Sequence, residues 1–286
     1  MTRREMLMLP AGALAHTAWA AKRYSVTGIV LRVDKAHRSF SASIAGIPGY
    51  MDAMSMPFVV RDARELETLQ PGAYVEFTLV VDKDDSWVEA IKPHRFVSMD
   101  REAFLARRLQ LLEPAGDQAK APEIGQPAPD FTLTDQTGHP VSLRQFAGKV
   151  VALTFIYTSC PLPNYCSRLS RNFESLNNRF ANRMGRDLAL LSVTFDPDHD
   201  TSPVLAAYAA TLRADPKSWH FLTGSLPDVQ AVCRRFGLNF WQEEGLLTHS
   251  LHTFVVDRVS KLAADFEGNE FTAAQLGDFV LSLMDR

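Results

Sequence analysis

The chain has 286 residues, of which 46% are hydrophobic and 22% charged, and its formal net charge is −3. This is the composition of a soluble globular protein, and the length is sufficient for two domains. So small a net charge offers no cationic surface for nucleic acid or an anionic membrane, so nucleic-acid binding is excluded as an expected function.

Residues 1–20 have the pattern of a secretory signal. Arg3 and Arg4 precede a short apolar run, and positions 18–20 read Ala-Trp-Ala, a small-x-small cleavage pattern. The run is too brief to span a bilayer and lacks the spacing of an amphipathic helix of the fold. The arginine pair also resembles a twin-arginine export signal. We expect a periplasmic or otherwise extracytoplasmic protein without a transmembrane segment in the mature chain, either released or tethered by an uncleaved signal.

Residues 21–93 are predicted to form a small all-β barrel, because five short runs of alternating hydrophobicity are separated by turn residues. Three methionines, Met51, Met54 and Met56, fall together in the stretch IPGYMDAMSMPF. On a strand Met54 and Met56 share one face. Three thioethers would make a soft, uncharged site for Cu(I), whereas methionine clusters more commonly fill a core, and the pattern alone leaves both interpretations open.

Residues 94–121 are predicted to connect two domains. A helical pattern over 98–113 is followed by a stretch rich in proline, alanine and glycine, which is typical of a linker.

Residues 122–286 alternate apolar strands with helical patterns, which predicts an α/β sheet layered with helices. Cys160 lies just past one predicted strand, and Cys166 lies near the start of the following helix, whose N-terminus favours a thiolate. Thioredoxin-type dithiols have two residues between their cysteines. The five residues here, including Pro161 and Pro163, form a wider loop that favours a metal clasp, while a redox pair or a structural disulfide remains open.

The second domain resembles the Sco/SenC family of copper-delivery proteins through IGQPAPDFTLTDQTGHPVSL, LTFIYTSCPLPNYC, LLSVTFDPDHDTSPVLAAY and THSLHTFVVD. The resemblance implies a thioredoxin-like fold and a copper site formed by Cys160, Cys166 and His249. In the family the histidine lies eight residues before an aspartate that ends a strand, which is Asp257 here. The family usually has three residues between its cysteines, so the five here are a departure. Two thiolates with one imidazole suit Cu(I), and the same ligands could also hold Cu(II). Zinc would prefer a fourth ligand.

The barrel resembles the CusF-like copper-binding domain through GIVLRVD, IPGYMDAMSMPF, LQPGAYVEFTL and WVEAIKP. The resemblance implies that Met54 and Met56 bind copper, with Met51 in the position of a tryptophan ligand. No histidine lies between His37 and His94, so an all-methionine site, or two methionines with a weak third partner, is expected. His37 is interpreted as a turn residue.

Several other residues have simpler interpretations. We expect a structural role for His252 and burial of Cys233 as a small hydrophobe. Asp196, Asp198 and Asp200 could form a hard-metal loop, but a turn and helix cap are favoured. Ser202 is expected to be the N-cap of the next helix, with Pro203 in its first turn.

The two resemblances together imply an exported copper chaperone rather than an enzyme. Its recipient would be a respiratory enzyme, and the resemblance points to cytochrome c oxidase, whose subunit II carries the dinuclear CuA centre. One alternative is an extracytoplasmic thiol-disulfide reductase that uses Cys160 and Cys166 on the cysteines of a copper enzyme. Another is periplasmic copper sequestration. Within the chaperone hypothesis, the linker would keep the barrel near the second domain for internal copper transfer.

Overall fold

The computed structural model describes residues 21–83, 85–93, 122–162, 164–238, 240–243, 246–249 and 251–285, and for 241–243 and 246–249 it describes the backbone alone. The predicted signal, residues 1–20, and the predicted connecting segment, residues 94–121, lie outside the described residues. Within the described part, no helix is long and apolar enough to cross a membrane.

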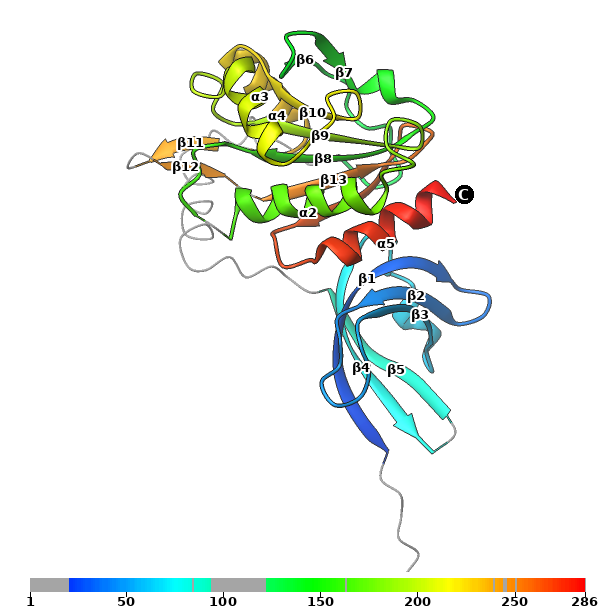
Figure 1. Cartoon of the computed structure of the whole chain (residues 1–286). Coiled ribbons are helices and arrows are strands. Elements are labelled where there is room, and N and C mark those ends of the chain that lie inside the picture. Colours follow the sequence, from blue (N-terminus) through cyan, green and yellow to red (C-terminus); the bar gives the residue numbers. More distant parts are fainter. Residues whose placement is uncertain are drawn as a thin grey trace, which may run out of the picture.

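The N-terminal part is a five-stranded antiparallel sheet in the order β3-β2-β1-β4-β5, as predicted (Figure 1). Its elements are β1 (Lys22–Asp34), β2 (Ser39–Ile44), β3 (Met54–Val59), the 3-10 turn Ala63–Leu66, β4 (Tyr74–Asp82) and β5 (Asp85–Pro93). An isolated bridge between Val60 and Val88 links the end of β3 to β5 and curls the sheet into a barrel. Its core centres on Phe40, Phe58 and Phe77, whose rings lie 5.0 to 5.6 Å apart.

The second part is a seven-stranded mixed sheet in the order β14-β13-β8-β9-β10-β6-β7. Its strands are β6 (Thr132–Asp135), β7 (Pro140–Ser142), β8 (Val150–Ile156), β9 (Leu188–Thr194), β10 (Trp219–Thr223), β13 (His252–Val256) and β14 (Leu262–Glu267). β8, β9 and β10 are parallel, and every residue of the three is buried. Strands buried on both faces have continuous apolar sequences, which is why β8 and β9 could be predicted from the sequence.

Helices cover both faces of this sheet (Figure 1). α2 (Cys166–Arg179) and α5 (Ala273–Met284) lie on one side, and α3 (Ser202–Thr211) and α4 (Leu226–Arg235) lie on the other. The predicted α/β architecture is therefore confirmed. A capping box of Thr272 and Gln275 starts α5. The barrel sits against α5, on the side of that helix away from the sheet.

Candidate metal centre

The two cysteines lie where the central strand β8 ends and α2 begins. The chain leaves β8 at Ile156, reaches Cys160 within four residues, and starts α2 at Cys166. Both thiols are free; Cys166 is buried and Cys160 is partly accessible. The N-cap of α2, Tyr165, makes no side-chain capping bond to the first amide groups of the helix. The predicted placement at a strand end and a helix start is thus found.

The two thiols are electrostatically unequal. A hydrogen bond from Cys166 lowers the pKa of Cys160 to about 6, against the opposing effect of burial. The same bond, burial and the neighbouring negative charge raise the pKa of Cys166 far above its ordinary value. At neutral pH the pair therefore holds one thiolate and one proton. Binding of a soft cation by both sulfurs requires the release of that proton.

A buried carboxylate fixes the start of the cysteine loop. Asp200 accepts a hydrogen bond of 3.0 Å from the backbone N–H of Thr158 and a second from the Thr158 hydroxyl. It also accepts one of 2.6 Å from the hydroxyl of Thr194, the last residue of β9. The loop that leads to Cys160 is thus tied to the neighbouring strand by a side chain with no solvent exposure.

Two predictions for the acidic loop and the helix after it are wrong. Asp200 does not cap α3, and Ser202 is not its N-cap, because the N-cap is Thr201 and Ser202 is already the first helical residue. Pro203 lies in the first turn, as predicted. Among the residues that the structure describes, no group of three His, Cys, Asp or Glu side chains could hold a metal ion, so Asp196, Asp198 and Asp200 form no hard-metal loop.

His249 is the last residue of a short hairpin formed by β11 (Phe240–Glu243) and β12 (Leu246–His249). β13 begins at His252 and runs antiparallel to β8, with Thr253 opposite Thr154. Figure 1 shows the hairpin and the loop before α2 at the same end of the sheet. The hairpin that ends at His249 therefore lies at the end of the sheet that carries the cysteine loop, while the imidazole of His249 lies outside the described side chains.

Three other residues occupy structural positions. His252 lies within 2.8 Å of Asp265 and stacks on the ring of Phe254. Cys233 is buried in α4, and burial raises its pKa to about 12, as suits a small hydrophobe. His37 lies in the turn between β1 and β2 and contacts Asp34.

Two of the three methionines lie on an edge strand of the barrel, and the third lies in the loop that precedes it. Met54 and Met56 are alternate residues of the edge strand β3, and Met54 is 45% exposed. Met51 lies in the loop before β3, where its backbone N–H and C=O both bond to Ile47. Met51 and Met56 also pack against the barrel core. The group is therefore partly core and partly accessible, so the core interpretation does not account for Met54.

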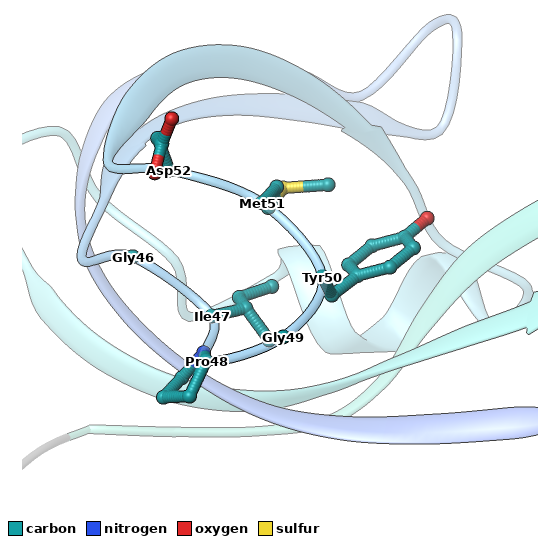
Figure 2. A pocket seen from close by; sticks show the side chains of 7 residues that line it. All are labelled: Gly46, Ile47, Pro48, Gly49, Tyr50, Met51 and Asp52. Atoms are coloured by element: carbon teal, nitrogen blue, oxygen red, sulfur yellow. The ribbon is translucent and has the colours of Figure 1, made fainter.

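An open pocket borders the loop from Gly46 to Asp52 (Figure 2). Met51 lines it, and in the figure its thioether and the ring of Tyr50 extend to the same side of the loop. Tyr50 stacks on Tyr24 with 4.3 Å between ring centroids. The stacked tyrosines hold the loop against β1, and sequence analysis missed this contact because the two residues lie in separate elements.

Comparisons with known proteins match both parts of the chain. The model of the SCO1/SenC family matches residues 118–284, and the model described as copper binding periplasmic protein CusF matches residues 23–93. Copper is therefore the metal named by the model that matches the barrel. It is also the metal that the donor atoms found here, thioether and thiolate sulfur, are suited to bind.

Individual relatives agree with the larger match. Protein sco1 of Schizosaccharomyces pombe is 27% identical, and the match covers 63% of this chain and 71% of that protein. The SCO1 protein homolog of Bacillus subtilis is 26% identical, and the match covers 55% of this chain and 81% of that protein. A SCO1/SenC family lipoprotein from Bacillus anthracis has a solved structure that is 23% identical, with a TM-score of 0.50 over 57% of this chain and 99% of that one. Its likeness confirms the expected thioredoxin-like fold. Because one family model spans more than half of its length, the chain belongs to the SCO1/SenC family.

Proposed function

We propose that this chain is an exported copper chaperone that binds Cu(I) at two sites and delivers copper to the CuA centre of cytochrome c oxidase subunit II. The observation that carries the proposal is the pair of free thiols at the carboxyl end of β8, within the region matched by the SCO1/SenC model. The family is linked to copper binding and to cytochrome c oxidase assembly, which supports the choice of recipient.

At the cysteine site, Cys160 and Cys166 would supply two thiolates, and His249 would supply one imidazole nitrogen. Cys160 binds first because its thiol is already ionised, and Cys166 follows with the loss of its proton. A recipient with its own thiolates then displaces these ligands one at a time. Each intermediate shares the ion between donor and recipient, so copper is never released free.

At the barrel site, Met51, Met54 and Met56 would hold Cu(I) through neutral thioethers. Thioethers need no deprotonation, so copper binding there should depend little on pH. Thiolates are stronger donors than thioethers, so copper loaded on the barrel should pass toward the cysteine site. Residues 1–20 would direct export, and the periplasmic protein named by the barrel's family model supports that location.

Anaerobic titration of the reduced chain with Cu(I) tests the proposal. We expect about two equivalents per chain, falling to one in Cys160→Ser/Cys166→Ser and, separately, to one when the three barrel methionines become leucine. Cys233→Ala and Met184→Leu are matched controls, because they change a thiol and a thioether outside both sites. Two equivalents retained in the double cysteine variant would refute the cysteine site.

A second candidate function is thiol-disulfide reduction, which the unequal thiols favour. The Cys160 thiolate would attack a disulfide of the target and release one target thiolate. Deprotonated Cys166 would then attack the mixed disulfide, leaving the target with two thiols and this chain with a disulfide. His249→Ala separates the candidates, because copper retention should fall while reduction of a target disulfide should continue.

A further inference from the structure

One outer face of the barrel is packed against the thioredoxin-like domain (Figure 1). Ile29 and Leu31 of β1 are buried in the apolar core of the second domain, while Val30 between them belongs to the core of the barrel. At Gly72, whose φ is +85°, a Cβ atom would lie only 2.3 Å from the Cβ of Ala264 in β14. The domains are therefore docked through a formed apolar interface, in addition to being joined by a linker.

A single carboxylate joins four elements at this interface. Asp278 of α5 accepts hydrogen bonds from the hydroxyls of Ser43 in β2, at 2.6 Å, and Ser55 in β3, at 2.5 Å. Its other oxygen accepts a hydrogen bond of 2.6 Å from the guanidinium of Arg179 in α2. Beside it, Gln275 donates to the backbone carbonyl of Ser43. Asp278 thus connects the second domain to the two neighbouring strands at the edge of the barrel.

Ser55 lies between two of the methionines. Side chains alternate along a strand, so Ser55 faces α5 while Met54 and Met56 project from the opposite face of β3. We propose that Asp278 is a positioning residue for the methionine site, because by holding Ser55 it fixes the strand from which Met54 and Met56 project. The inference rests on the proposed copper-binding role of these methionines.

The geometry also gives the direction of the effect. β3 is at the edge of the sheet order, and its ladder of backbone pairs is made with β2, apart from the single bridge at Val60 that links its end to β5. A strand paired along one side and bridged only at its end gains order from a further attachment on its outer face. Ordering the methionines before copper arrives reduces the cost of binding, so docking should raise the Cu(I) affinity of the barrel. Because such coupling is reciprocal, Cu(I) should also strengthen docking.

The test uses the full chain in a Cys160→Ser/Cys166→Ser background, so that Cu(I) binds at the barrel alone. Cu(I) affinity is measured by competition with a chromophoric Cu(I) chelator, and domain separation by small-angle X-ray scattering. Asp278→Lys places a second cation beside Arg179 and removes the acceptor for both serines, while Ser55→Ala removes one donor. Ser41→Ala, two residues before Ser43 on the same face of β2, is the matched control.

We expect Ser55→Ala and Asp278→Lys to weaken Cu(I) binding at the barrel by about fivefold or more, with Ser41→Ala unchanged. In the same variants with the cysteines restored, the affinity of the cysteine site should not change, whereas general loss of structure would lower both. Unchanged barrel affinity in Asp278→Lys would overturn the inference, whether or not the domains separate. A parent protein that binds no Cu(I) would instead refute the methionine site itself.

Discussion

Replacing Asp200 by asparagine should destabilise the thioredoxin-like domain and loosen the cysteine loop. The buried carboxylate accepts bonds from the backbone and hydroxyl of Thr158 and from the Thr194 hydroxyl, and it lies 2.9 Å from Nδ1 of His199. Asparagine has only one accepting oxygen. Its NH2 group would replace the other carboxylate oxygen and would face hydrogen-bond donors that it cannot accept from. Losing two bonds to a charged acceptor, at about 1.5–3 kcal/mol each, predicts a cost of about 3–6 kcal/mol. That is a large share of the roughly 5–15 kcal/mol that stabilises a typical domain.

Denaturant unfolding of the reduced, copper-free protein would measure this cost. Asp198→Asn is the matched control, because Asp198 lies in the same loop and its side chain is exposed. A second measurement is the alkylation rate of Cys160, which should change in Asp200→Asn only, since Thr158 anchors the loop just before it. A free energy of unfolding within about 0.5 kcal/mol of the parent, as for an ordinary surface substitution, would refute the reasoning.

Three further predictions concern other parts of the chain. In the reduced protein at pH 7, iodoacetamide should modify Cys160 well before Cys166, with a rate that halves near pH 6; equal rates by mass spectrometry would contradict the assigned thiolate. Burial raises the pKa of Asp278, but the bonds from both serines and from Arg179, the cation that faces it, leave it lowered overall. Because its pKa is lowered, the Asp278 carboxylate stabilises docking at pH values above about 4, the pKa of an unfolded aspartate, and this contribution is lost as the pH falls below that value. Small-angle X-ray scattering should therefore show the domains separating only on acidification below about pH 4. Gly28→Ala should destabilise the barrel by about 1–3 kcal/mol in denaturant unfolding, because its Cβ would lie 2.8 Å from a backbone oxygen of β2; unchanged stability would show that the strands can move apart.

The features that sequence analysis predicted are those encoded locally. The buried run of β8, the helix that follows it and the two cysteines between them are adjacent along the chain, so their arrangement could be inferred. The short strands β10 and β14 were not predicted. β10 is buried along its whole length, so it lacks the alternation of a half-buried strand, and His220 interrupts its apolar run.

The contacts that could not be predicted join residues far apart in sequence. Ile29 to Leu31 form an unbroken apolar run where a barrel strand facing water on one side should alternate, and this signals a second buried face. It does not identify the partner, which lies more than 200 residues later in α5 and β14. The bond of Asp200 to Thr158 was hidden for the same reason, since an acidic residue before a helix more commonly acts as its cap.

The burial of the third cysteine limits how the chain can oxidise. Three cysteines permit three different pairings. Cys233 is buried on the core side of α4, and burial raises its pKa to about 12, so it offers almost no thiolate for disulfide exchange. Oxidation should therefore yield one cross-linked isomer, between the two sulfurs of the loop, with no scrambled forms to be repaired.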